Sequence, residues 1–120
     1  MIDDSRAMRM ILRRILEGCG YAVVEAGDGA QALAALEAAE QLPVLALVDW
    51  NMPVMDGLEF VQTVRARKQL RGITLMMVTT ESEQAQIVRA LAAGAHEYVL
   101  KPFTADAIVD KLGLLGLAAA

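Results

Sequence analysis

Residues 44–49 read Val-Leu-Ala-Leu-Val-Asp, a continuous apolar run that ends in an aspartate. An apolar run of this length predicts a β-strand that is covered on both faces, as strands of parallel sheets are. Residues 73–78 and 98–100 form two further runs of this kind, which are followed by Thr79 and Lys101. Residues 22–26 are a fourth, short strand candidate. The sequence therefore predicts a buried sheet.

Segments with the apolar spacing of helices separate these strands. Ser5 is a capping residue, and apolar residues follow it at intervals of three and four. This first stripe consists of Met8, Ile11, Leu12, Ile15, Leu16 and Cys19. Asp28 begins a helix that we expect to reach about Gln41, and Thr104 caps the last helix. Strands alternating with helices predict an α/β fold with a doubly wound parallel sheet.

The composition excludes several classes of protein. The chain has 120 residues, 56% of them hydrophobic, which suits one compact domain spanning residues 1–120. Its formal charge of −4 and the lack of a basic stripe argue against nucleic-acid binding. A single cysteine excludes an internal disulfide, and no apolar run approaches the roughly 20 residues that span a membrane. We therefore expect a cytoplasmic protein without a membrane segment.

Polar residues occur where the predicted strands end. Asp3 and Asp4 follow the first apolar residues, and Asp49, Thr79 and Lys101 follow the three long runs. Ligands of such sheets bind beyond the carboxyl ends of the strands, so these side chains are expected to share one pocket. Three crowded carboxylates repel one another unless a hard divalent cation lies among them, and Mg²⁺ fits such oxygen ligands best.

A carboxylate beside a metal ion suits phosphoryl transfer. Asp49 is already a competent nucleophile at neutral pH and needs no separate base. The charge on the transferred oxygens must be neutralised, which the metal, Lys101, the Thr79 hydroxyl and backbone N–H groups can share. The sequence thus predicts a phosphoacceptor site at Asp49.

Six short motifs are spread along the whole chain: Asp3-Asp4-Ser5, Asp49-Trp50-Asn51-Met52-Pro53, Met55-Asp56-Gly57, Val78-Thr79-Thr80, Ala93-Gly94-Ala95 and Lys101-Pro102-Phe103-Thr104. Together they resemble the motifs of response-regulator receiver domains, in particular CheY-like single-domain members. The resemblance implies a flavodoxin-like, five-stranded parallel sheet of order 2-1-3-4-5. It also implies a two-component signalling switch of chemotaxis type rather than a metabolic enzyme.

The resemblance further implies a role for each site residue. Asp49 accepts the phosphoryl group, and Thr79 and Lys101 bind it. Asp4, Asp49 and the backbone carbonyl of Asn51 bind Mg²⁺ (or Mn²⁺) directly, while Asp3 acts through water.

Other positions would control the lifetime and the output of the phosphorylated state. By resemblance, Thr80 contacts the phosphoryl group through its backbone, and Asn51 and Glu81 tune its lifetime. Thr79 and Tyr98 would form the conformational switch. A sensor histidine kinase would be the phosphodonor, and a downstream protein would dock on the face formed by helix 4, strand 5 and helix 5.

The beginning of the chain departs from the family pattern. Only Met1 and Ile2 precede Asp3, whereas receiver domains have a central apolar strand of about five residues there. A short central strand leaves backbone groups of both neighbouring strands without partners, at a cost of about 1 to 3 kcal/mol each. Either residues upstream of Met1 are missing from this sequence, or the free edges pair with another copy of the chain. We therefore expect lowered stability, or self-association as a homodimer or by strand exchange.

Two other functions remain as alternatives. The first is a receiver that is inactive in phosphorylation and serves only as a protein-interaction module, which the short first strand favours. The second is a Mg²⁺-dependent phosphatase with an aspartate nucleophile. That chemistry needs a second acid two residues after Asp49, where this chain has Asn51, so the phosphatase is disfavoured.

Overall fold

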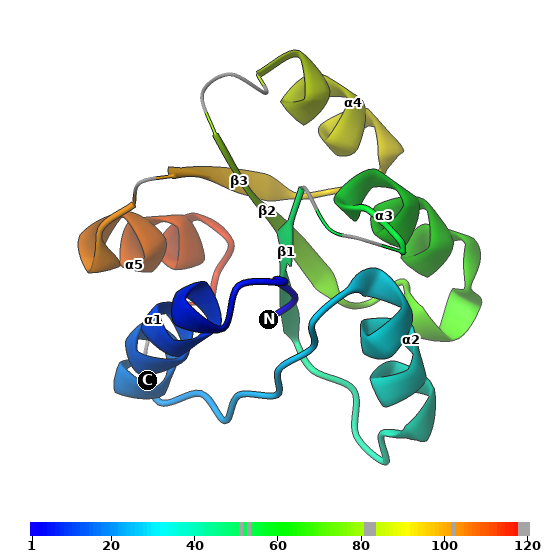
Figure 1. The fold of residues 1–120 in the computed structure, drawn as a ribbon, viewed down its shortest axis with the longest axis horizontal. Helices are drawn as coiled ribbons and strands as arrows, with labels where there is room; N and C mark the ends of the chain where they lie inside the picture. Colours follow the sequence, from blue (N-terminus) through cyan, green and yellow to red (C-terminus); the bar gives the residue numbers. More distant parts are fainter. Residues whose placement is uncertain (51, 53, 81–83, 102, 118–120) are drawn as a thin grey trace.

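The computed structural model describes residues 1–50, 52, 54–80, 84–101 and 103–117, and it has a parallel sheet between two layers of helices (Figure 1). The sheet contains β1 (Leu45–Asp49), β2 (Thr74–Thr80) and β3 (Glu97–Lys101), in the order β1-β2-β3. All three strands fall on the apolar runs that predicted them. Their parallel register directs all three carboxyl ends toward one edge of the sheet.

The N-terminus extends the sheet beyond β1 by isolated bridges. Ile2 forms parallel bridges to Val48 of β1 and to Ala26. Its N–H donates to the Leu47 carbonyl at 2.8 Å, and its carbonyl accepts from the Asp49 N–H at 2.9 Å. Ile2 therefore lies between residue 26 and β1, which is the predicted strand order 2-1-3-4-5 with the first strand reduced to one bridging residue.

The predicted strand over residues 22–26 is wrong in extent. Only Ala26 makes a bridge, and residues 22–25 have no strand assignment. A strand at this position pairs with the first strand, and Met1, Ile2 and Asp3 offer partners only to its last residues. The Ala26 N–H donates to the Met1 carbonyl at 3.0 Å, and the Asp3 N–H donates to the Ala26 carbonyl at 3.1 Å.

Three helices begin directly after the residues that the sequence indicates, Ser5, Asp28 and Thr104. The five helices are α1 (Arg6–Gly18), α2 (Gly29–Ala38), α3 (Gly57–Ala66), α4 (Gln84–Ala93) and α5 (Ala105–Leu114), with a short 3₁₀ helix η1 at Lys68–Leu70. The side chains of Ser5, Asp28, Asp56 and Thr104 accept hydrogen bonds from the first turns of α1, α2, α3 and α5. The second helix ends at Ala38, before the predicted Gln41. Among the described residues, no helix has the length and apolar character needed to cross a membrane.

Each face of the sheet packs against its own set of helices. Ala46, Val48, Leu75 and Met77 face α2, α3 and α4, whereas Leu47, Met76, Val78 and Val99 face α1 and α5 (Figure 1). Successive residues of one strand are thus buried on opposite faces, which explains why the runs are continuously apolar. In the apolar stripe of α1, Leu12 and Leu16 are buried. Ile11 is 48% exposed, so the predicted burial of Ile11 is wrong.

A longer first strand should stabilise the domain. We predict that four or five apolar residues added before Met1 raise the melting temperature by about 5–10 °C, since two restored backbone hydrogen bonds contribute about 1 kcal/mol each. A Gly/Ser extension of equal length is the control for added chain. Equal melting temperatures for the two extensions, measured by calorimetry, would contradict the prediction.

Candidate functional site

The strand ends bring the predicted polar residues together. Asp49 and Lys101 are the last residues of β1 and β3, and Thr79 is the next to last residue of β2. Asp3 directly follows the bridging residue Ile2, whose carbonyl is bonded to the Asp49 N–H. Four neighbouring strand positions therefore deliver their side chains to one edge of the sheet.

Three carboxylates meet at this edge. Asp3, Asp4 and Asp49 each offer one oxygen, and these oxygens lie within 4.8 Å of one another. Asp3 and Asp49 are buried, at 2% and 6% exposure, whereas Asp4 is exposed. Asp3 Oδ1 accepts a hydrogen bond from the Ser5 N–H at 2.9 Å. Asp3 Oδ2 is buried and has no hydrogen-bond partner within the described ranges.

Lys101 supplies a positive charge to this cluster. Its Nζ donates to Asp49 Oδ1 at 2.9 Å and lies 3.7 Å from Asp3 Oδ2. Burial raises the pKa of Asp49, and the charges of Asp3 and Asp4 raise it further against the opposing effect of Lys101. Burial by itself would lower the pKa of Lys101. The hydrogen bond and charge of Asp49, together with the charges of Asp3 and Asp4, outweigh burial, so the pKa of Lys101 is raised.

The residues at this site fit a hard divalent cation. Three ionised carboxylates against the one ammonium of Lys101 leave two negative charges in excess, which matches one divalent ion. All the available ligands are oxygens, as Mg²⁺ prefers. The buried Asp3 Oδ2 supports this fit, because it has no hydrogen-bond partner and shares the Lys101 ammonium, 3.7 Å away, with Asp49.

Gly57 allows α3 to approach the strand end that carries Asp49. A Cβ atom at Gly57 would lie 2.8 Å from the Asp49 carbonyl oxygen and 3.0 Å from Trp50 Cα. The Gly57 N–H also donates to the Trp50 carbonyl at 3.0 Å. A side chain here would therefore push the helix away from the site or displace the Asp49 backbone. The motif containing Gly57 was noted in the sequence, but this role was not predicted.

Arg9 is a second residue that the sequence analysis missed. It lies in the first turn of α1, where its Nη1 donates to the Asp3 carbonyl and its Nε to Glu25 Oε1 at 3.2 Å. It thus joins the backbone of the acidic loop to the segment before Ala26. The sequence could have indicated this role, because Arg9 lies four residues after the capping Ser5. That spacing on a helix places its side chain next to the acidic loop.

The remaining predicted residues have varied surroundings. Thr79 is 2% exposed, and Thr80 and Tyr98 are partly buried. The Lys111 ammonium lies 4.6 Å from the centre of the Tyr98 ring. Trp50, which follows Asp49, is buried at 7% exposure. Asn51 and Glu81, predicted to bind the metal and to tune the phosphorylated state, lie outside the described residues.

Comparison with known proteins decides the family. The model of the family described as "Response regulator receiver domain" matches residues 1–113. The chain belongs to the response regulator receiver domains. It is 42% identical over 113 residues to chemotaxis protein CheY1 of Helicobacter pylori, covering 93% of this chain and 90% of that protein. A chemotaxis protein CheY homolog of Campylobacter jejuni is also 42% identical, with 93% and 86% covered.

Solved structures of receiver domains have the same fold. The chemotaxis response regulator CheY4 of Vibrio cholerae superposes with a TM-score of 0.86 at 34% identity, covering 95% of this chain and 93% of that one. The bacteriophytochrome response regulator AtBRR gives a TM-score of 0.83 at 30% identity, with 99% and 91% covered. These similarities confirm the CheY-like receiver fold. Receiver domains bind Mg²⁺ at an acidic pocket, in accord with the cluster of Asp3, Asp4 and Asp49.

The close approach at Gly57 can be tested with a matched pair of glycines. We predict that Gly57→Ala lowers the free energy of unfolding by about 1–3 kcal/mol, because the added methyl meets backbone atoms. Gly113→Ala in α5 has nothing within 4 Å of the new Cβ and should stabilise by about 0.5–1 kcal/mol. Urea denaturation measures both, and a neutral Gly57→Ala would contradict the close-contact argument.

Metal binding can be followed without any phosphodonor. We predict that Mg²⁺ at ten times its dissociation constant stabilises the domain by about 1.4 kcal/mol, because the ion binds only the folded cluster. Asp4→Asn and Asp49→Asn should each weaken this stabilisation. Asp110→Asn makes the same charge change at an exposed position of α5 and should not. Equal Mg²⁺ responses in Asp49→Asn and Asp110→Asn would place the ion elsewhere.

Proposed function

We propose that this receiver domain is a phosphoacceptor response regulator of a two-component system, phosphorylated on Asp49 by a sensor histidine kinase. The observation that carries the proposal is the surroundings of the Asp49 carboxylate. It is buried at a strand end, 2.9 Å from the Lys101 ammonium, with the carboxylates of Asp3 and Asp4 beside it. The match of the family model to residues 1–113 supports one receiver domain over the chain, which we propose spans residues 1–120.

In the proposed transfer, an oxygen of Asp49 attacks the phosphorus of a phosphohistidine. A P–O bond forms while the P–N bond breaks, and its electron pair returns to the imidazole nitrogen. Lys101 already holds Asp49 Oδ1, so the other carboxylate oxygen is the nucleophile. Lys101 then neutralises charge on the phosphoryl oxygens, and the Thr79 hydroxyl is proposed to donate to one of them. Bound Mg²⁺ would supply the remaining charge neutralisation through Asp3, Asp4, Asp49 and the Asn51 carbonyl.

The switch returns to its resting state by hydrolysis. Water attacks the phosphorus, the P–O bond to Asp49 breaks, and the carboxylate is regenerated with release of inorganic phosphate. We propose that Asn51 and Glu81 set the rate of this step and that the Thr80 backbone helps to hold the phosphoryl group. Receiver domains of this type are regulators rather than metabolic enzymes, so the lifetime of the phosphorylated state matters more than turnover.

The signal is proposed to leave through the face formed by α4, β3 and α5. Tyr98 of β3 lies under the Lys111 ammonium of α5, and Lys111 also pairs with Glu97 at 3.1 Å. A groove of about 400 Å³ beside them is lined in part by Phe103 and Ala107. Phosphorylation would move Thr79 and let Tyr98 turn, which would reshape this groove for a downstream protein. The chemotaxis names of the relatives support a chemotaxis-type pathway.

A module that is inactive in phosphorylation is the second candidate. One bridging residue, Ile2, joins Asp3 to the sheet, so the acidic cluster rests on few backbone hydrogen bonds. If this support is too weak, the metal does not bind and Asp49 is not phosphorylated. Docking through the face of α4, β3 and α5 would then be the only activity.

Phosphorylation tests the proposed function directly. We predict that incubation with Mg²⁺ and a small acyl phosphate or phosphoramidate adds the mass of one phosphoryl group to the intact chain. Asp49→Asn should add none, and Lys101→Met should lose most of the reaction because the ammonium no longer neutralises the transferred oxygens. Intact-mass spectrometry with Asp110→Asn as the control distinguishes the outcomes. A folded, Mg²⁺-binding chain that gains no mass would favour the interaction module.

A further inference from the structure

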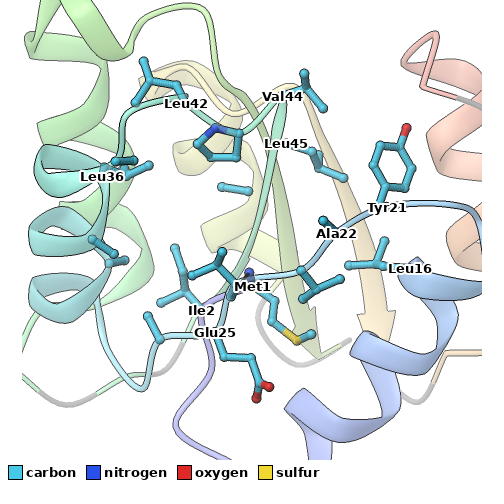
Figure 2. A pocket seen from close by; sticks show the side chains of 18 of the residues that line it. Met1, Ile2, Leu16, Tyr21, Ala22, Glu25, Leu36, Leu42, Val44 and Leu45 are labelled. Atoms are coloured by element: carbon cyan, nitrogen blue, oxygen red, sulfur yellow. Dashed lines mark hydrogen bonds between the residues drawn. The ribbon is translucent and has the colours of Figure 1, made fainter.

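A group of hydrogen bonds joins α3, α4, β2 and β3 at the amino edge of the sheet, opposite the acidic cluster. Its members are Arg65 in the last turn of α3, Leu75 at the start of β2, Gly94 just after α4 and His96 just before β3. We call these four residues the His96 latch. The same edge borders a cavity of about 360 Å³, lined in part by Leu45 of β1, and none of the latch residues lines that cavity (Figure 2).

The Arg65 guanidinium is the centre of the His96 latch. Its Nε donates to the Gly94 carbonyl at 2.9 Å, and its Nη1 donates to the Arg71 carbonyl at 2.8 Å. Its Nη2 lies 3.0 Å from His96 Nδ1. Arg71 Nε in turn donates to the Arg65 carbonyl at 3.0 Å. One side chain of α3 thus holds both the turn between α4 and β3 and the loop that leads from η1 to β2.

Gly94 leaves the space that the Arg65 side chain occupies. A Cβ atom at Gly94 would lie 2.6 Å from Arg65 Cγ, and the φ of +123° is one that residues with side chains rarely adopt. The backbone of the turn after α4 therefore lies directly against the aliphatic part of Arg65, which a side chain at residue 94 would prevent.

The hydrogen bonds fix the protonation state of the His96 ring. The Leu75 N–H donates to His96 Nδ1 at 3.1 Å, and the Arg65 guanidinium has only N–H groups to offer to the same atom. His96 Nδ1 therefore accepts both bonds and carries no proton, so the proton of the neutral ring is on Nε2. The His96 N–H also donates to the Leu75 carbonyl at 2.8 Å, so both backbone groups of Leu75 are bonded to His96.

A proton on His96 Nδ1 would break this arrangement. It would direct a hydrogen at two donors and place an imidazolium beside the Arg65 guanidinium. Leu75 is fully buried, so no water would replace the acceptor that its N–H loses. Burial and then the charge of Arg65 lower the pKa of His96. Because this pKa is lower in the folded chain than in the unfolded chain, the latch is destabilised as the pH falls from the ordinary histidine pKa to the lowered one.

The charged groups around His96 leave Arg65 as its partner. Arg71 comes from the loop after η1, and its Nε is directed at the Arg65 carbonyl. Glu97 follows His96 in β3, and its carboxylate accepts from Lys111 of α5 at 3.1 Å. α4 and β2 contribute backbone groups to the latch. Of the charged groups in the described part of the chain, Arg65 is therefore the one bonded to the ring.

We propose that the His96 latch is a pH-dependent conformational switch. With a neutral ring, it holds the turn between α4 and β3 against α3 and β2, and protonation of His96 Nδ1 releases that turn and the end of α4. The step is the uptake of one proton from solvent, without any covalent change. His96 is partly exposed, so its ring can exchange this proton without unfolding of the domain.

The consequence for signalling rests on the proposed function. α4 is one of the three elements of the proposed output face, so release of its end would link the shape of that face to pH. The latch itself needs no phosphoryl group, metal ion or partner protein. Its tests therefore succeed or fail independently of Asp49 phosphorylation.

The experiment follows the unliganded chain by NMR between pH 8 and pH 5.5. His96 is the only histidine, so its ring signals are assigned without ambiguity. At pH 8 we expect a proton on Nε2 and none on Nδ1. The Leu75 amide signal and the His96 ring should titrate with one midpoint, below about 6.5. Protection of the Leu75 N–H from hydrogen exchange should fall at least threefold over this range.

Two results of this titration would overturn the proposal. The first is a proton on His96 Nδ1 at pH 8, since the ring would then be a donor rather than the acceptor that the latch requires. The second is a Leu75 amide signal that does not follow the titration of the ring.

Two substitutions of His96 reproduce the closed and open states. The Oδ1 atom of His96→Asn replaces Nδ1 as an acceptor but does not titrate, so the loss of Leu75 protection at low pH should disappear. His96→Leu offers no acceptor, so Leu75 protection should be low at every pH. Every other titrating group is the same in the three chains. A loss of protection in His96→Asn equal to that of the unchanged chain would refute His96 as the switch, and the titration of the unchanged chain is decisive by itself if His96→Asn stays open.

A substitution of Arg65 tests the other half of the latch. Arg65→Met retains an apolar side chain but removes the donors and the charge, so the pKa of His96 should rise toward its ordinary value. Arg14→Met makes the same change at an exposed position of α1 and should leave the titration midpoint of His96 unchanged. Equal midpoints in the two variants would contradict the contact between Arg65 and His96.

Discussion

Two buried carboxylates, Asp3 and Asp49, share one ammonium, that of Lys101, at the carboxyl edge of the sheet. This deficit of positive charge determines the chemistry of the rest of the site. Burying ionised groups without enough opposite charge costs free energy, so such a cluster does not stabilise the fold. The raised pKa of Asp49 records this cost, since the folded chain holds that proton more tightly than the unfolded chain does. Ionisation of Asp49 therefore weakens the fold as the pH rises from the ordinary pKa of an aspartate to the raised pKa of Asp49, and a bound cation opposes that effect.

The backbone around the cluster is held from several directions. Parallel strands fix Asp49 and Lys101, and the missing side chain of Gly57 lets α3 pack against the Asp49 carbonyl. Asp3 has less support, because Ile2 makes only isolated bridges. Arg9 compensates in part by bonding the Asp3 carbonyl and linking it to Glu25. Positioning of the first carboxylate thus depends on one bridging residue and one arginine.

Sequence reasoning succeeded where local pattern and burial agree. The runs that became β1 and β2 are buried on both faces, so an apolar pattern without alternation was sufficient, and the polar residue after each run marked the site edge. It failed where the outcome depends on a distant partner. Residues 22–25 have strand-like composition but lack a neighbour to pair with, and Ile11 fits the stripe of α1 but lies at its exposed margin. The close contact at Gly57 is likewise invisible without the positions of Asp49 and Trp50.

The bridges of Ile2 connect the acidic cluster to the sheet. On one side Ile2 is bonded to Leu47 and Asp49, and on the other side its two chain neighbours are bonded to Ala26. Ordering of the sheet around Ile2 therefore also orders Asp3. A cation that fixes Asp3 would also order Ile2, and ordering of Ile2 would in turn favour binding of the cation. Because such coupling is reciprocal, the two effects have the same magnitude. A single residue with its two bridges is the physical route by which that coupling would act.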